Sequence, residues 1–243
     1  MTRKVLAPPV GLWHFLSRPH FIFCLNLRKL ETNLSFQWYV NSMSKSAPGV
    51  RFAEIDRETK ETTIHVVLDI DGGTKQDIST GIGFFDHMLH LMAFHGQFDV
   101  GIEAEGDLHI DDHHTVEDVG IVLGRAFREA LEASGPIERY GSCHMVMEEA
   151  LVLVALDISG RSGIFFDCTF SREVVGGMAT ENVKEFLRAF VSNAGFTLHV
   201  KKLAGENDHH IIEAIFKGLG RVLEDATQKS ERRSGNSTKG RID

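Results

Sequence analysis

This chain has few cysteines, fewer basic than acidic residues and no long apolar run. Its 243 residues include three cysteines, Cys24, Cys143 and Cys168, which have neither paired spacing nor a CxxC motif. A disulfide framework is therefore excluded, and a reducing compartment is expected. The net charge of −8 argues against nucleic acid as a partner. No apolar run reaches membrane-spanning length, so no membrane partner is expected.

The first 42 residues differ in composition from the rest. They contain five lysines and arginines but a single acidic residue, and they show no clear hydrophobic periodicity. Two explanations fit: a transit peptide that directs the chain to an organelle, or a translated leader upstream of a start at Met43, which we favour. In either case we expect residues 1–50 to be an N-terminal extension outside the fold. The expected location is cytoplasmic, with organelle targeting by this extension as the alternative.

The most informative feature is a histidine-rich motif that occurs twice. Residues 112–117 read DHHTVE and residues 208–213 read DHHIIE, so both fit the pattern DHHxxE. Similar helical patterns follow the two motifs, at 120–127 and 214–223. Imidazoles and carboxylates at helical spacing are what a transition-metal site requires. The repetition predicts a duplicated chain that builds two metal sites.

The spacing within the motif indicates how the ligands divide. Residues four apart lie on one face of a helix, so the first histidine and the glutamate of each motif can hold one ion together. The second histidine is turned by roughly 100° and is expected to serve another ion. The i,i+4 pairs are His113 with Glu117 and His209 with Glu213, and the second histidines are His114 and His210.

Extending the repeat backwards adds a ligand to each site. Residues 86–98 align with residues 184–196 through an amphipathic run and a phenylalanine, which sets His87 opposite Glu185. Taken alone, Glu185 would be an ordinary exposed helix carboxylate. A mixed nitrogen and oxygen set without thiolate suits manganese, iron or zinc, and the octahedral choice among them is manganese. The two expected sets are His87, His114, His209 and Glu213, and His113, Glu117, Glu185 and His210.

Alternating and helical hydrophobic patterns predict a similar order of elements twice. Strands clustered before and between paired helices indicate an α+β fold. We expect two repeats, 51–140 and 141–230, whose helices pack between two mostly antiparallel sheets, and then a polar, mobile tail at 231–243. The predicted strands are 62–70, 99–105, 151–158, 163–170 and 197–202, and the predicted helices are 84–94, 112–131, 180–194 and 209–228.

Several longer runs match a known family. They are Gly81–Met88, Gly106–Asp118, Leu156–Arg161, Thr197–Val200, Gly205–His210 and Ser237–Gly240. On these runs the chain, from about residue 51 to residue 240, resembles the imidazoleglycerol-phosphate dehydratases, which are lyases of histidine biosynthesis. The resemblance implies a duplicated fold like that of the second domain of ribosomal protein S5. It also implies two manganese ions (Mn²⁺) in each active site and a 24-subunit homo-oligomer whose sites are shared between subunits.

The chemistry of that family explains the residue types. Its substrate, D-erythro-imidazoleglycerol phosphate, carries an imidazole ring, a diol and a phosphate, and its hydroxyl leaves from the carbon beside the ring. If both ring nitrogens bind metal, the ring becomes an imidazolate that can expel hydroxide to give a diazafulvene. Loss of a proton from the next carbon then gives an enol and finally the ketone, imidazole acetol phosphate. The metals thus act as Lewis acids and as a template.

The resemblance also implies which side chains hold the substrate. Glu61 matches a substrate-contacting glutamate and is the first candidate for the catalytic proton shuttle, with a merely charged strand end as the alternative. Arginine suits a bidentate phosphate clamp. The other candidate substrate-binding residues are His95, Arg139, Arg161, Lys217, Ser237, Thr238 and Lys239.

The chain departs from the family pattern at three places. Glu185 stands where some members have histidine, residues 145–149 lack the usual proline and aspartate, and the tail does not end in apolar residues.

Two other functions compete with the dehydratase. A dinuclear metallohydrolase would need an open water site and would act on phosphoesters, whereas a metal-buffering shell would leave the basic residues around the ligands unexplained.

Overall fold

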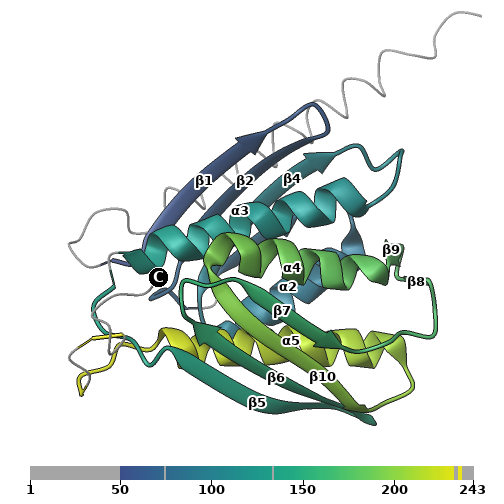
Figure 1. Cartoon of the computed structure of the whole chain (residues 1–243). Coiled ribbons are helices and arrows are strands. Elements are labelled where there is room, and N and C mark those ends of the chain that lie inside the picture. Colours follow the sequence, from purple (N-terminus) through teal and green to yellow (C-terminus); the bar gives the residue numbers. More distant parts are fainter. Residues whose placement is uncertain (1–49, 74, 133, 233–234, 237–243) are drawn as a thin grey trace, which may run out of the picture. The chain divides into compact units, whose positions relative to one another are not determined.

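The computed structural model describes residues 50–73, 75–132, 134–232 and 235–236, and within them two sheets enclose a layer of helices (Figure 1). Residues 1–49 of the predicted extension lie outside this described part, and so does the end of the predicted tail with Ser237, Thr238 and Lys239. None of the described helices is long and apolar enough to cross a bilayer.

The first sheet comes from the first half of the chain. Its strands lie in the order β1-β2-β4-β3. β1 pairs with β2, and β2 with β4, in antiparallel register, whereas β3 runs parallel to β4. The strands are β1 (Phe52–Glu58), β2 (Thr62–Asp69), β3 (Gln76–Ser79) and β4 (Asp99–Gly106).

The second sheet repeats this topology in the second half. Its order is β5-β6-β10-β7, with β5–β6 and β6–β10 antiparallel and β7 parallel to β10. A small hairpin of β8 (Val174–Val175) and β9 (Met178–Ala179) interrupts only this half. The strands of the sheet are β5 (Tyr140–Met147), β6 (Ala150–Ile158), β7 (Gly163–Asp167) and β10 (Phe196–Ala204).

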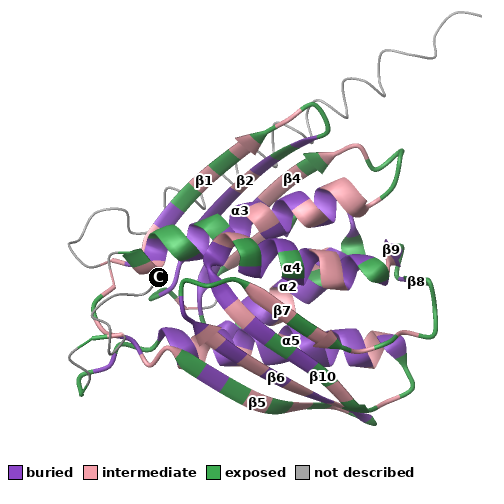
Figure 2. Ribbon diagram, viewed as in Figure 1, coloured by how far each residue is buried: buried purple, intermediate pink, exposed green. Residues whose placement is uncertain are grey.

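The helices pack across the boundary between the halves. They are α2 (Gly83–Gly96), α3 (His113–Glu132), α4 (Glu181–Ala194) and α5 (Asp208–Thr227). α3 lies on β1, β2 and β4 and contacts α4 of the second half, while α5 lies on β5 and β6 and contacts α2 of the first half. Amphipathic helices of this kind bury one apolar face on a sheet and another on a partner helix. The result is one continuous core between the sheets (Figure 2).

Phenylalanine rings form the centre of this core. Phe85 of α2 lies 5.3 Å, centroid to centroid, from Phe186 of α4, which in turn stacks on Phe216 of α5 at 5.4 Å. Phe127 of α3 meets Phe190 of α4 edge to face at 5.5 Å. All five rings are fully buried, and each contributes about 1.5–3 kcal/mol to folding. Because the Phe85–Phe186 and Phe127–Phe190 contacts join residues of different halves, the halves share their stabilisation.

Two glycines allow the helices to come this close. A Cβ built on Gly124 of α3 would lie 3.0 Å from Cβ of Asn193 and 3.1 Å from the amide nitrogen of Ala194 in α4, and closer still to the carbonyl oxygen of Phe190. Gly220 of α5 similarly meets the backbone of α2. Side chains at these positions would force the helix axes apart.

The expected α+β architecture, with helices between two mostly antiparallel sheets, is confirmed. Two details were wrong. β7 ends at Asp167 rather than at residue 170, and strands β1, β3, β5, β8 and β9 were not predicted. β1 and β5 are edge strands. β1 alternates charged residues with half-buried ones, and β5 alternates exposed residues with half-buried ones, so their apolar signal is weak. The exact repeat boundary at 140/141 remains a prediction.

Candidate metal centre

Both histidine motifs lie at helix starts. His113 is the first residue of α3, and its backbone N–H donates to Asp111. Asn207 caps α5 by accepting a hydrogen bond from the N–H of His209. Asparagine and aspartate are preferred at such positions because they satisfy N–H groups that have no partner in the helix. The caps thereby fix where each motif enters its helix.

The structure brings together three residues of the first predicted ligand set. His87 of α2 and His209 and Glu213 of α5 each offer a ligand atom, and these atoms lie within 4.8 Å of one another. His209 Nε2 is 3.3 Å from Glu213 Oε2. The ring of Phe84 packs edge-on against His209 at 5.2 Å, which restricts its orientation. The fourth member, His114, is not part of this group.

Basic side chains surround this group. Lys217 Nζ lies 2.5 Å from Glu213 Oε1, one helical turn further along α5. Burial alone would raise the pKa of Glu213, but the hydrogen bond and charge of Lys217, with the charges of His209 and His87, lower it overall. Near the end of α2, burial lowers the pKa of His95, and so do the charges of Lys217 and Arg221. Glu213 is thus held as a carboxylate, the form that binds a cation.

His210 belongs to a different group. With Glu148 and Glu149 it forms the other cluster of three close ligand atoms within the described residues. His210 Nδ1 is 2.7 Å from Glu149 Oε2. This bond raises the pKa of His210, and together with the backbone N–H of Asn207 it lowers the pKa of Glu149 to about 2.

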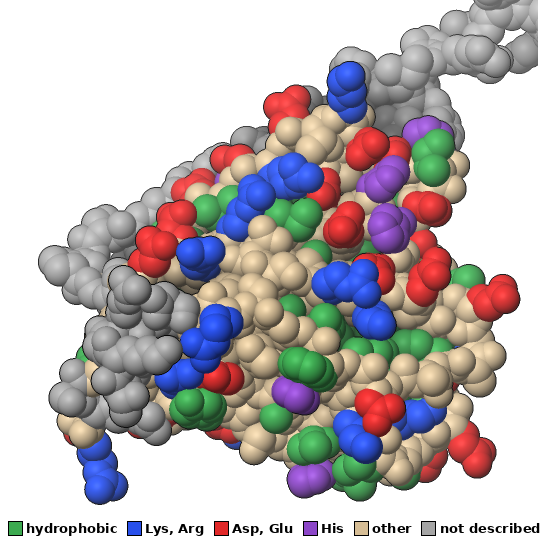
Figure 3. All heavy atoms as spheres, in the orientation of Figure 1, with side chains coloured by type: hydrophobic (Ala, Val, Ile, Leu, Met, Phe, Trp, Pro, Cys, Tyr) green, Lys and Arg blue, Asp and Glu red, His purple; other side chains and the backbone are tan. Residues whose placement is uncertain are grey.

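The motif at the start of α3 is more open. His113 Nε2 lies 3.9 Å from Glu117 Oε2, the predicted i,i+4 pair, and His113 Nδ1 lies 3.0 Å from the amide oxygen of Asn182 in α4. His114 Nδ1 lies 3.0 Å from Asp107, and this hydrogen bond raises the pKa of His114. Figure 3 shows histidine and acidic side chains gathered at the end of the molecule where β4 leads into α3.

The second predicted ligand set is not assembled within one chain. In the part that the structure describes, no metal-sized group unites His113, Glu117, Glu185 and His210. Glu185 instead pairs with Arg188 at 2.6 Å, one turn along α4. Of the eight predicted ligands, the described part of one chain therefore brings together His87, His209 and Glu213, and separately the pair of His113 and Glu117, while His210 lies with Glu148 and Glu149.

The aspartate of each motif has a structural role. Asp112 accepts a hydrogen bond from the backbone N–H of Ala179 in the β8–β9 hairpin. Asp208 accepts two backbone N–H groups and a hydroxyl from Ser171 and Arg172. Both motifs thus hold the segment between β7 and α4, which explains why the aspartates recur although they were not predicted as ligands.

The predicted phosphate-binding arginines lie far from the histidines. Arg139 forms a bidentate pair with Asp157 and donates to the carbonyl oxygen of Asn236. Asp157 is near the end of β6, and Glu149 directly precedes the start of that strand. Their separation along the extended strand is about 26 Å. Arg161 lies just after the end of β6 that contains Asp157, and its backbone N–H donates a hydrogen bond to Ser159 Oγ.

Glu61 lies in the turn between β1 and β2, where its backbone N–H donates a hydrogen bond to Thr59 Oγ1. Its charge contributes to the raised pKa of His114. The next residue, Thr62, pairs with Gly106, which precedes the His114 partner Asp107, so Glu61 lies near the start of α3. Glu61 is exposed. An exposed carboxylate beside a predicted ligand is suitably placed to reach a bound molecule.

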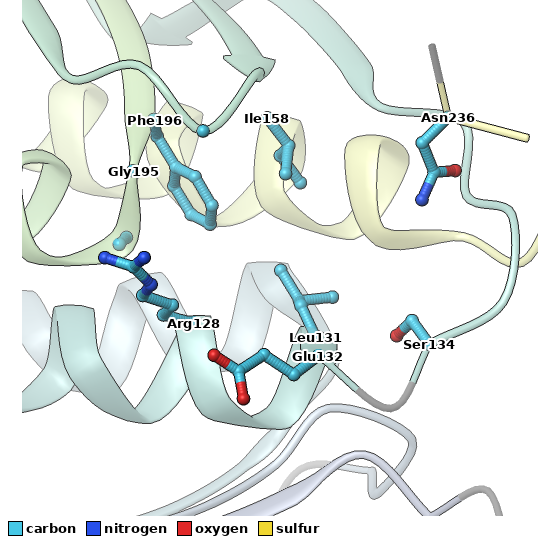
Figure 4. A pocket seen from close by; sticks show the side chains of 10 residues that line it. Arg128, Leu131, Glu132, Ser134, Ile158, Gly195, Phe196 and Asn236 are labelled. Atoms are coloured by element: carbon cyan, nitrogen blue, oxygen red, sulfur yellow. The ribbon is translucent and has the colours of Figure 1, made fainter. Parts of the chain in front are cut away.

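A cavity of about 480 Å³ lies at the opposite end of α3 (Figure 4). It is lined by Arg128 and Glu132 of α3, by Ile158 and Phe196, and by Asn236. About 22 Å of helix separates Arg128 from His113. With one acidic side chain and no histidine in its lining, the cavity does not offer a metal-ligand set.

The donors present fit a transition metal. Each close group combines imidazole nitrogen with carboxylate oxygen, as manganese, iron and zinc all accept. Burial raises the pKa of Cys143, and it raises that of Cys168 to about 11. Neither thiol belongs to these groups, so within the described residues both groups consist of imidazole and carboxylate alone.

Comparisons with known proteins agree with these features. The family model for imidazoleglycerol-phosphate dehydratase matches residues 80–223. The dehydratase of Caldicellulosiruptor saccharolyticus is 59% identical over 176 residues, 72% of this chain and 91% of the relative. That of Acetivibrio thermocellus is 58% identical over 190 residues, 78% of this chain and 97% of the relative.

Solved structures agree as well. The imidazoleglycerol-phosphate dehydratase of Staphylococcus aureus is similar with a TM-score of 0.68 and 39% identity, covering 74% of this chain and 99% of that one. The dehydratase of Pyrococcus furiosus gives a TM-score of 0.66 and 42% identity, covering 76% of this chain and 99% of that one.

Proposed function

The chain belongs to the imidazoleglycerol-phosphate dehydratase family and is a hydro-lyase of histidine biosynthesis, and from this premise we propose how its residues dehydrate imidazoleglycerol phosphate. The observation that carries the proposal is the convergence of His87, His209 and Glu213 beside Lys217. Two imidazoles and an ionised carboxylate form a cation site, and the adjacent ammonium group can receive an anionic substrate.

We propose manganese as the metal, two ions in each active site, held by the eight predicted ligands. When bound, the ions would act as Lewis acids on both ring nitrogens, which favours the imidazolate and hence expulsion of hydroxide to give the diazafulvene. The ligand sets are His87, His114, His209 and Glu213, and His113, Glu117, Glu185 and His210.

Glu61 is the proposed proton shuttle. The reaction requires removal of a proton from the carbon next to the one that loses the hydroxyl, so a carboxylate must reach beyond the ring. Glu61 lies in the β1–β2 turn, directly before Thr62, which pairs with Gly106 next to the His114 partner Asp107. His95 is proposed to contact the substrate from the end of α2, where its lowered pKa favours the neutral ring.

The phosphate of the substrate is proposed to bind basic residues of more than one subunit. Within one chain, Arg139 lies at the opposite end of β6 from the histidine groups. A complete site therefore needs a second copy of the chain. This separation supports the proposed homo-oligomer with shared sites, for which the family resemblance suggests 24 subunits. The proposed phosphate-binding residues are Arg139, Arg161, Lys217, Ser237, Thr238 and Lys239.

The proposal is tested by a dehydratase assay on protein stripped with chelator and then restored with manganese. We expect activity to be lost and regained, and His113→Ala and His210→Ala each to abolish turnover and lower bound metal. Full activity with normal metal content in either variant would refute the ligand assignment. Hydrolysis of phosphoesters without dehydration would instead favour a metallohydrolase.

A separate test concerns assembly and the tail. Deleting residues 237–243 should raise KM strongly because the deletion removes a proposed phosphate-binding cation, while metal content and elution in size-exclusion chromatography stay unchanged. Unaltered kinetics would remove the tail from the proposed site.

We also propose a cytoplasmic location, which expression of a tagged full-length chain and its truncation at Met43 would distinguish from targeting by the extension.

A further inference from the structure

We propose that Asp107 and Glu149 are positioning residues for the metal centre, each fixing the second histidine of one motif with its Nε2 atom turned toward the metal. The inference rests on the proposed metal ligands, His114 and His210 among them, and adds residues that the motif itself does not contain. Neither Asp107 nor Glu149 is proposed as a ligand.

The contact between Glu149 and His210 is held from two sides. Oε2 of Glu149 lies 2.7 Å from His210 Nδ1. Oε1 accepts the backbone N–H of Asn207 at 3.0 Å and that of Glu206 at 3.4 Å. Both carboxylate oxygens are therefore engaged within the chain. A carboxylate anchored to the backbone just before α5 is well suited to orient the histidine that follows.

Asn207 indicates which ring nitrogen of His210 carries the proton. Its amide oxygen accepts the N–H of His209, so its amide nitrogen is the atom that faces His210 Nε2, at 3.5 Å. An amide nitrogen can only donate, and Nε2 must then be an acceptor. The proton of the neutral ring accordingly sits on Nδ1 and is donated to Glu149. Nε2 carries the lone pair that a metal requires, and a bound ion would replace its long 3.5 Å contact with the Asn207 amide.

His114 has the same arrangement in the first half. Its Nδ1 lies 3.0 and 3.2 Å from the two oxygens of Asp107, in the loop between β4 and α3. Both second histidines thus direct Nδ1 to a carboxylate, so Nε2 is the nitrogen that would bind a metal. Such a partner fixes the ring and raises its basicity toward a metal. The first histidine of the α3 motif, His113, uses the neutral amide of Asn182 instead.

The carboxylates come from different places in the two halves, and this difference is informative. Glu149 directly precedes β6, as Glu61 directly precedes β2, so the two glutamates occupy equivalent turns. In the second half that glutamate bonds the histidine. In the first half Asp107 has this role, and Glu61 is left for the substrate. The duplication has thus yielded one positioning carboxylate and one proposed catalytic carboxylate from the same turn.

The two positioning residues should act on different ions, because His114 and His210 belong to different proposed ligand sets. The test is a titration of chelator-stripped protein with Mn²⁺, in which free Mn²⁺ is measured by electron paramagnetic resonance. Wild type should bind two ions per subunit. Asp107→Ala and Glu149→Ala should each raise the dissociation constant of one Mn²⁺ ion by about 10–100-fold and leave that of the other ion unchanged. The double variant should raise both dissociation constants.

Two further variants separate positioning from a general structural effect. Asp107→Asn keeps an oxygen that can accept from Nδ1, so it should lose less affinity than Asp107→Ala. Glu224→Gln is the matched control, since Glu224 pairs with Arg221 on α5, about 21 Å along the helix from His210. It should bind manganese like wild type. The unfolding midpoint of the metal-free protein should change little in these variants, and its change should not follow the loss of manganese affinity.

The inference is overturned if the alanine variants bind both ions as tightly as wild type. It is also overturned if the manganese affinity of these variants falls only in proportion to the stability of the metal-free protein. The same holds if Asp107→Asn binds manganese as weakly as Asp107→Ala. A wild-type protein that binds no manganese would refute the proposed metal centre itself, and this inference with it.

Discussion

Replacing Gly124 by alanine tests whether close helix contact stabilises the shared core. Alanine is the better helix former by about 1 kcal/mol, so propensity alone predicts a more stable protein. The added Cβ, however, would lie 3.0–3.1 Å from atoms of Asn193 and Ala194 and still closer to the carbonyl oxygen of Phe190. A backbone carbonyl cannot rotate away as a side chain can, so the overpacking cost should reach the upper end of its usual range, about 3 kcal/mol.

The net expectation is a loss of about 2 kcal/mol in the free energy of unfolding, from about 3 kcal/mol of overpacking less about 1 kcal/mol of propensity. Urea denaturation of chelator-stripped protein at one fixed protein concentration measures it, because association and bound metal also change apparent stability. The matched control is Gly83→Ala at the start of α2, where a Cβ would meet nothing within 4 Å. If Gly124→Ala equals or exceeds both wild type and this control in stability, the close-contact argument is wrong.

Two other predictions concern charge and thiols. Arg51 lowers the pKa of Asp71 by a bidentate hydrogen bond, so the pair stabilises the fold above the unfolded pKa of about 4 and loses this effect as pH falls through the lower folded pKa. Asp71→Asn should therefore cost about 1–2 kcal/mol in urea denaturation at pH 7 and less at pH 3; an equal loss at both pH values would contradict the assignment. In a Cys24→Ser variant, Cys143 and Cys168 should react slowly with a thiol reagent at pH 8, since burial raises both thiol pKa values, and rapid reaction of the native protein would show that these thiols are accessible thiolates.

The periodic spacing of apolar residues was sufficient to predict the long helices. The helix expected at 112–131 is α3 at His113–Glu132, because its apolar residues recur at helical spacing over five turns. The same approach failed for β1, whose sequence FAEIDRE alternates charged residues with only partly buried ones. Edge strands bury one face incompletely, so their pattern is weak even where the pairing is regular. The family resemblance noted in the sequence is confirmed by the comparisons.

The candidate site was predictable only where it is local. Spacing of four residues correctly indicated that His209 lies beside Glu213. It could not reveal Glu149, which reaches His210 from a hairpin turn 61 residues earlier in the chain. The available signal was topological: this turn corresponds to the one that contains Glu61. Which ligands from separate copies would meet is beyond any pattern within one chain.

The crossed packing of the helices has a consequence for the origin of the duplication. Because α2 and α3 of the first half rest on α5 and α4 of the second, a polypeptide of one half alone would leave the phenylalanine faces of its helices in water. An ancestor of half the present length would have needed a second copy to fold, so gene fusion would have converted an obligate dimer into one chain. Fragments divided between α3 and β5 should accordingly remain unfolded apart and regain structure by complementation when mixed.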